Sequence, residues 1–331
     1  MNKKLQQALK YIFLFIIGAF VLWITFKDED LNEIWIKIKQ ADPFYISLSL
    51  ILGFLAFLSR AYRWILLIEP AGHTARKSQA CYALMSGYFA NLALPRMGEF
   101  TRCAMLSKKE KIPFDVLLGT VIVERVIDLF MLLFSIGLVL IFEWSLMTEF
   151  IHTNVLTPDS YLVKYKKLIV ILIVVSLILL FLIWRKLNQQ KENLPKSIVK
   201  IKNLVSGIWS GMKTVINLKR RSSFIAHTLF IWICYFFMTY VCFFALEATS
   251  GLGTGEGLFV LVAGGLGMSA PVQGGIGAYH WIVSQALMLF DISSTDGIAY
   301  ATLVHTYQTL LVIVAGIISL FLYSFSTSKA S

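Results

Sequence analysis

The sequence predicts an all-α, polytopic integral membrane protein, on the basis of its composition, its long apolar segments and the charges of its loops. Hydrophobic residues make up 57% of the 331 and charged residues only 15%, whereas soluble domains carry about 25% charged residues. Mean hydropathy is +0.73. The net charge of +11 comes from basic loops between apolar segments. This pattern predicts contact with anionic lipid headgroups and no nucleic-acid partner.

Six apolar segments are long enough to cross a membrane, which takes roughly 20 residues for a ~30 Å hydrocarbon core. They are Ala8–Phe26, Phe44–Ile68, Phe114–Phe142, Leu168–Trp184, Phe224–Leu246 and Ile298–Tyr323. The first ends without the small residues of a signal-peptide cleavage site, so we expect it to be a retained span. The four cysteines have no CxxC spacing, and we expect no disulfide framework and no metal site.

Two further apolar segments, Gln79–Pro95 and Gly257–Phe290, are interrupted by glycine and proline. A bilayer accepts such broken helices only where protein or a water-filled cavity surrounds them, so both are predicted to be re-entrant helical hairpins. The expected hinge residues are Pro95, Gly98, Pro271, Gly274, Gly275 and Gly277. The predicted bundle therefore has about six full spans and two re-entrant hairpins.

Loop charges orient these segments. Loop 185–223 holds ten basic residues and one acid, whereas loop 27–42 holds three lysines and five acids. Because cytoplasmic loops are rich in Lys and Arg, we expect a multi-pass protein of the plasma membrane with both termini in the cytosol. Between Ile198 and Val215 apolar residues recur every three or four positions. They predict a basic amphipathic helix, either in the inner headgroup layer or docked on the spans.

The order of spans and hairpins suggests an inverted repeat within a single membrane domain, residues 1–331. Residues 8–142 and 168–325 each run span, span, hairpin, span, and both hairpins contain Pro-x-x-Gly. In inverted-repeat transporters the substrate site lies between such halves. Two unrelated loops are the alternative interpretation.

Ionisable residues inside the apolar segments are the first candidates for function. Glu124, Arg125 and Asp128 lie within one predicted span, where each charged group costs about 2.5–3.5 kcal/mol at the centre of the helix. Arg125 is three residues from Asp128 and is expected to pair with it. The three residues, with Gln273 and His280 of the second hairpin, are expected to line a polar path. A structural ion-pair network is the alternative.

Basic residues near the cytosolic side are candidates for binding phosphate. Arg60 and Arg63 lie at the end of the second span, where snorkelling to the interface explains both. Arg96, Glu99 and Arg102 follow the first hairpin at three-residue steps and share one helix face. Guanidinium groups beside free backbone amides would suit a lipid phosphate.

Four segments together resemble the lysylphosphatidylglycerol synthase transmembrane-region family: Ser59–Trp64, Gly87–Arg102, Glu124–Asp128 and Pro271–Gly277. The resemblance implies a lipid-handling membrane domain like the flippase half of the aminoacyl-phosphatidylglycerol synthases. The family usually has a glutamate where this chain has His280, which departs from the pattern. The soluble aminoacyl-transferase domain of those synthases is missing from this sequence, so transfer of lysine is not expected.

These features together predict a flippase-like protein, not an enzyme, that binds or translocates an anionic or polar-headed lipid such as a phospholipid or a polyprenyl-phosphate carrier. No Walker motif is present, and no cofactor is expected. One alternative is a membrane transferase for lipid-linked substrates, with Glu124 and Asp128 as acid and base. Another is a non-catalytic scaffold whose partner is a lipid-modifying enzyme. The oligomeric state does not follow from the sequence.

Overall fold

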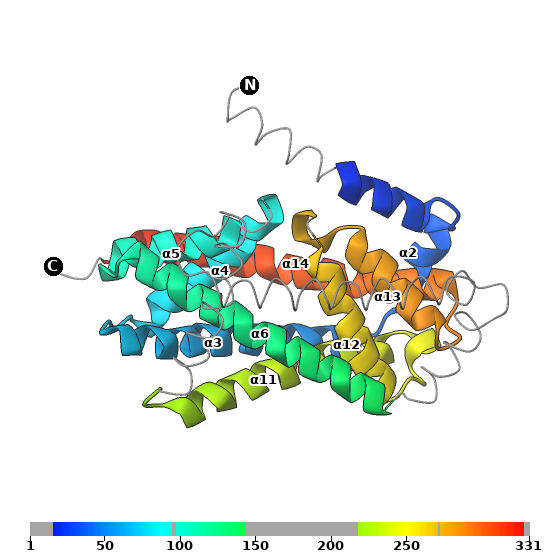
Figure 1. Ribbon diagram of the computed structural model, residues 1–331. Helices are drawn as coiled ribbons and strands as arrows, with labels where there is room; N and C mark the ends of the chain where they lie inside the picture. Colours follow the sequence, from blue (N-terminus) through cyan, green and yellow to red (C-terminus); the bar gives the residue numbers. More distant parts are fainter. Residues whose placement is uncertain (1–15, 95–96, 143–217, 271, 328–331) are drawn as a thin grey trace, which may run out of the picture. The chain divides into compact units, whose positions relative to one another are not determined.

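The computed structural model describes residues 16–94, 97–142, 218–270 and 272–327, and within these ranges its regular elements are all helices (Figure 1). The chain divides into two compact units, residues 1–136 with 214–331, and residues 137–213. The second lies almost entirely outside the described residues, as do the predicted span Leu168–Trp184 and the predicted amphipathic helix. The elements are a helix at Ile16–Phe26, α2 (Leu31–Gln40), α3 (Pro43–Ile68), η1 (Glu69–Ala71), α4 (Lys77–Ala93), α5 (Met97–Glu110), α6 (Phe114–Phe142), α11 (Arg221–Tyr240), η3 (Val241–Ala245), η4 (Glu247–Thr249), α12 (Thr254–Ser269), η5 (Gln273–Gly275), α13 (Ala278–Met288) and α14 (Ser294–Phe325).

Four helical segments among the described residues are long and apolar enough to cross a membrane: Pro43–Ala71, Phe114–Phe142, Arg221–Ala245 and Ser294–Phe325. They correspond to four of the six predicted spans. The part of the first predicted span that is described, Ile16–Phe26, is also helical. The prediction of an all-α membrane bundle is confirmed, because hydropathy reports directly on what a bilayer accepts.

Capping residues set the start of several helices at one end of the bundle. The Asp42 carboxylate accepts from the Phe44 amide at 2.8 Å before α3, and Ser293 accepts from the Asp296 amide at 3.1 Å before α14. Each cap satisfies a backbone donor that the helix leaves free. Asp296 also pairs with Lys37 of α2 at 2.6 Å. These contacts gather α2 and the starts of α3 and α14 at the same end.

The loops at the two ends differ sharply in charge. The end where α3 and α14 start, which we call the acidic end (residues 27–42, 246–254 and 290–297), holds eight acids and three lysines. The opposite, basic end (residues 69–77, 108–113 and 218–221) holds eight Lys and Arg and two acids. Arg76 pairs with Glu110 at 2.7 Å and Arg220 with Glu69 at 3.4 Å, which brings these loops together.

The predicted hairpin Gln79–Pro95 is a single helix, α4, as far as Ala93, and the first hairpin is formed by α4 with α5, which pack closely through glycine. A side chain on Gly98 would overlap the Gly87 carbonyl oxygen. The Gly98 amide instead donates to the Asn91 side-chain oxygen at 2.6 Å. Small residues allow two helices inside a membrane to approach this closely. Gly98 thus has a packing role in the structure, its predicted hinge role stays a prediction, and Pro95 lies outside the described residues.

Helices α12 and α13, joined by η5, form the second predicted hairpin. Gly274, Gly275 and Gly277 have φ values of 56°, 74° and 80°, a left-handed conformation that disfavours other residues. The predicted break is confirmed here, although Pro271 lies outside the described residues. Gly274 lies against Leu92 of α4, so the turn of the second hairpin reaches the first hairpin.

Candidate functional site

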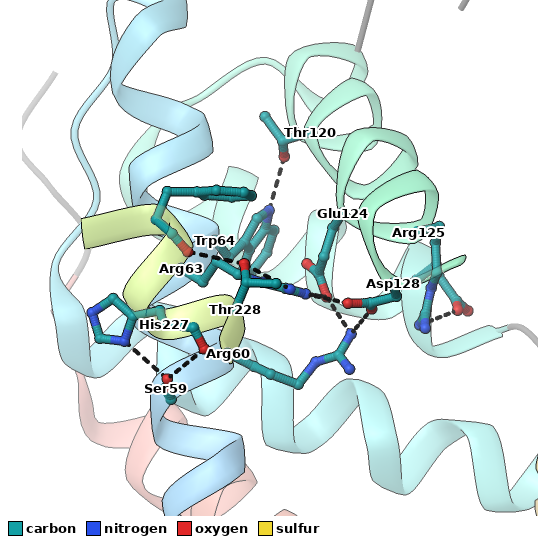
Figure 2. A network of polar contacts seen from close by, with 12 residues as sticks. Ser59, Arg60, Arg63, Trp64, Thr120, Glu124, Arg125, Asp128, His227 and Thr228 are labelled. Atoms are coloured by element: carbon teal, nitrogen blue, oxygen red, sulfur yellow. Dashed lines mark hydrogen bonds and ion pairs between the residues drawn. The ribbon is translucent and has the colours of Figure 1, made fainter. Parts of the chain in front are cut away.

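Buried charged side chains from three helices meet in one cluster, which we call the arginine cluster. Figure 2 shows its members from α3 and α6. It consists of Arg60 and Arg63 from α3, Arg102 from α5, and Glu124 and Asp128 from α6. Arg60 and Arg63 are one turn apart on α3, as are Glu124 and Asp128 on α6, so each helix presents two groups on one face.

The carboxylates of α6 receive hydrogen bonds from all three arginines. Arg60 donates to both Glu124 and Asp128, the latter at 2.8 Å, and Arg63 donates to Asp128 at 2.7 Å. Arg102 donates to the other carboxylate oxygen of Glu124, at 3.0 Å. The side chains of Arg63 and Glu124 are 0% exposed. Such burial is tolerated only because each charge has hydrogen-bonded partners.

The location of Arg60 and Arg63 corrects the snorkelling interpretation. Both side chains are buried and bind carboxylates of α6, so they do not extend toward lipid headgroups. The interpretation failed because it considered one helix alone. In the folded chain α6 covers this end of α3 with two acids.

Arg125 departs from its predicted pairing. It binds Glu99 of α5 at 2.7 Å, whereas Asp128 is bound by Arg60 and Arg63. Successive residues of a helix point about 100° apart, so Arg125 lies beside the face that Glu124 and Asp128 share. The predicted pair Arg125–Asp128 is wrong, while the predicted common face of Glu99 and Arg102 holds because both contact α6. Arg96 lies outside the described residues.

The arginine cluster has one more positive than negative charge. Three guanidinium groups face two carboxylates, and the neighbouring pair of Arg125 and Glu99 adds no net charge. The Nη2 atom of Arg102 is buried and has no hydrogen-bond partner in the part of the chain that the structure describes; the same holds for the Nε atoms of Arg60 and Arg63. Unsatisfied buried donors of this kind favour an additional anion or a polar ligand.

Aromatic and hydroxyl side chains complete the site, and the sequence reasoning did not assign a role to them. Tyr235 of α11 accepts from Arg60 at 3.0 Å, and the Arg102 guanidinium lies 4.8 Å from the centre of the Trp64 ring. The buried Tyr88 hydroxyl is without a partner among the described residues. Tyr88 and Trp64 fall within the family-like motifs and could have been identified there. Tyr235 has no comparable signal.

The exposure of the charged side chains rises from the interior of the arginine cluster to the neighbouring Arg125. Glu124 is fully enclosed, the Asp128 side chain is 15% exposed, and the Arg125 side chain is 45% exposed. The exposed edge lies where α5 meets α6.

His280 and Gln273, which were predicted to share a polar path with Glu124, belong to the second hairpin. His280 contacts the ring of His305, with centroids 4.8 Å apart, and not the arginine cluster. Gln273 lies in η5. His305 and Gln308, one turn apart on α14, contact the Gly274 carbonyl oxygen at 2.7 Å and the Ser49 hydroxyl at 3.0 Å. The structure thus has two polar groupings, one at each hairpin.

Comparison with known proteins agrees with this architecture. A UPF0104 membrane protein of Methanocaldococcus jannaschii is 32% identical over 136 residues, which make up 39% of this chain and 38% of that relative. No solved structure matches the chain. The model of the lysylphosphatidylglycerol synthase TM region matches residues 11–316. The chain is thus a multi-pass membrane protein that belongs to the lysylphosphatidylglycerol synthase TM region family.

Proposed function

We propose that this protein binds an anionic or polar-headed membrane lipid at the arginine cluster and moves its headgroup across the bilayer. The observation that supports the proposal is the surplus guanidinium charge, with the buried and unsatisfied Nη2 atom of Arg102 beside the first re-entrant hairpin. A lipid phosphate supplies both the negative charge and the acceptor oxygens that this atom lacks. A phospholipid and a polyprenyl-phosphate carrier both provide that chemistry.

The proposed path runs from the exposed edge at Arg125 inward. Arg102 is the proposed phosphate ligand, with Arg60 and Arg63 behind it. Glu124 and Asp128 hold the arginines in place, so that the headgroup meets oriented donors in a low-dielectric setting where charge interactions are strong. The meeting of the two hairpins near Gly274 and Leu92 supports the proposal that rearrangement of the two halves moves the headgroup.

The transferase alternative receives less support from the site. An acid or base needs a carboxylate that can exchange a proton, but Glu124 and Asp128 are each held by two arginines. We therefore propose that they position the arginines and are not catalytic.

Loss of the Arg102 guanidinium tests lipid binding. The Arg102→Gln variant is expected to bind phosphate-bearing lipid at least about tenfold more weakly, because a charge-assisted hydrogen bond contributes about 1.5–3 kcal/mol. Native mass spectrometry of gently purified protein measures the bound lipid, and transbilayer movement of fluorescent phosphatidylglycerol in reconstituted vesicles measures transport. Arg220→Gln is the matched control, since Arg220 forms an exposed ion pair at the basic end. Equal lipid retention by both variants would exclude Arg102 as a ligand.

The charges of the two ends also predict an orientation. We propose that the basic end faces the cytosol of the cell and the acidic end faces outward, with the protein in the plasma membrane and both termini inside. Single cysteines at Lys219 and Glu247 in a cysteine-free background are expected to react with a membrane-impermeant maleimide in opposite ways. In intact cells only the residue-247 position should be labelled, and labelling at 219 alone would reverse the assignment.

A further inference from the structure

The turn of the second hairpin is held by a histidine from another helix. The Nε2 atom of His305, in α14, lies 2.7 Å from the Gly274 carbonyl oxygen. A carbonyl can only accept, so Nε2 must carry the hydrogen. Gly274 stands in the left-handed part of the turn, at φ 56°. One imidazole N–H therefore adds a contact from α14 to a turn that is also held by backbone hydrogen bonds from Gly275 to Val272 and from Ile276 to Gln273.

A second imidazole packs against the first. The rings of His280 and His305 are 4.8 Å apart between centroids and inclined by 59°. The Nδ1 atom of His280 is buried and has no hydrogen-bond partner within the described ranges. Phe26 lies on another side of His280, at 6.1 Å between centroids. An imidazole nitrogen in this setting is free to receive a proton but has no acceptor to stabilise the added charge.

The surroundings of the pair contain no counter-ion among the contacts shown by the described residues. Titratable neighbours are Tyr279, which packs on His305, and the Tyr300 and Cys242 side chains of the same buried cluster as Tyr279. All three are uncharged at neutral pH. Contacts from α3, α4, α11 and α12 to this part of α13, α14 and η5 include the uncharged groups Ser49, Leu92, Thr239, Gly264 and Met268, and the helix Ile16–Phe26 contacts the turn through Gly18.

The charged residues nearest in sequence to these helices lie at the acidic end, where Glu29 accepts from the Ser294 and Thr295 hydroxyls of α14 and Asp291 follows α13. Lys27 binds Asp28 at 3.4 Å, and Lys37 binds Asp296 at 2.6 Å. Asp296 is nine residues before His305 on α14, or about 14 Å along the helix. A proton on either imidazole would therefore be a buried cation with no acid among the contacts that the described residues show.

We propose that His280 and His305 form a proton-binding site whose occupancy opens the second re-entrant hairpin. With both rings neutral, His305 holds the Gly274 carbonyl and the turn stays closed. A proton on the pair introduces an uncompensated charge in a low-dielectric interior. The closed packing is then less stable than an open turn that admits water or an anionic group. Proton uptake and opening are thus thermodynamically linked.

If lipid movement is coupled to this site, the proton is the ion that drives it; this extension rests on the proposed function. A negatively charged headgroup between the hairpins would compensate the bound proton, and both could move together. The opening of the hairpin by a proton does not depend on any lipid, so the two ideas can fail separately.

Hydrogen–deuterium exchange of the purified full-length protein tests the proton site directly. The amides of residues 272–283 are compared at pH 7.5 and pH 5.5, after correction for the intrinsic exchange rate. Protection in the unaltered protein is expected to fall about tenfold at the lower pH, which is within the range that uptake of one proton allows. The amides of α11 serve as the internal reference for global stability.

Neutral variants separate titration from packing. His280→Gln and His305→Gln together should remove the pH dependence, and the glutamine amide at 305 can still donate to Gly274. His280→Gln alone serves the same purpose if the double variant does not fold. His227→Gln is the control, because His227 contacts Ser59 beside the arginine cluster at 2.9 Å, and it should keep the full pH effect. Equal protection at both pH values in the unaltered protein, or an unchanged fall in His280→Gln, would overturn the proposal.

Discussion

Glu124→Ala is expected to destabilise the protein by about 3–5 kcal/mol, because it leaves the buried Arg102 guanidinium without a carboxylate partner among the described residues. Arg60 and Arg102 both donate to Glu124, and the glutamate is completely buried. Removing it raises the excess charge of the arginine cluster from one to two. Arg102 would lose its only carboxylate among the contacts of the described residues.

The loss can be measured as a shift in the unfolding transition of the protein in detergent micelles. Glu247→Ala is the matched control, since Glu247 is an exposed acid at the acidic end. Exposed substitutions of this kind change the free energy of unfolding by about 0.5 kcal/mol or less. Equal transitions for the two variants would show that the charges of the cluster do not stabilise the fold.

A double variant distinguishes charge imbalance from the loss of shape. Glu124→Gln alone should destabilise the protein, whereas Arg102→Gln with Glu124→Gln restores the original excess of one charge. Because the two residues are in direct contact, their effects should not be additive. The double variant is expected to be more stable than Glu124→Gln. Additive losses would contradict the electrostatic account of the cluster.

Gly98→Ala is expected to cost about 3 kcal/mol, at the upper end of the range for overpacking. The added methyl group would overlap the Gly87 carbonyl oxygen and lie 2.7 Å from the Asn91 amide group. Backbone cannot rotate away as a flexible side chain can, so α4 and α5 must separate. The separation would also displace Arg102, one turn further along α5.

Gly119→Ala in α6 provides a control of opposite sign. A methyl group there meets nothing within 4 Å, and alanine is favoured over glycine in a helix by about 0.5–1 kcal/mol. Unfolding transitions of the two variants should therefore move in opposite directions. If Gly98→Ala is as stable as the unaltered protein, the hairpin is not closely packed at this position.

The histidine site was less accessible to sequence reasoning than the hairpin that contains it. The glycines at 274, 275 and 277 predict a backbone break, because only glycine adopts left-handed conformations without strain. Nothing in the sequence indicates that His305, 31 residues from Gly274, bonds to that turn. Such a contact depends on how α14 packs against α13.

The sequence by itself determined the membrane class, the spans that lie in the described residues and the two broken hairpins. These follow from local properties, since each segment must satisfy its own backbone and match its own surface to the lipid. The sequence also predicted that Glu124, Arg125 and Asp128 avoid lipid because of their cost, although the Arg125 side chain is 45% exposed in the structure. The half-repeats 8–142 and 168–325 stay a prediction, because the second includes residues outside the described ranges.

Only the tertiary structure decided which charges meet. Arg60 and Glu124 are 64 residues apart, and a buried charge has the same cost whichever partner neutralises it, so hydropathy cannot identify the partner. The packing of the helices pairs the two acids of α6 with Arg60, Arg63 and Arg102, and it pairs Arg125 with Glu99. The same packing left one guanidinium in excess, which is the physical basis of the proposed lipid site.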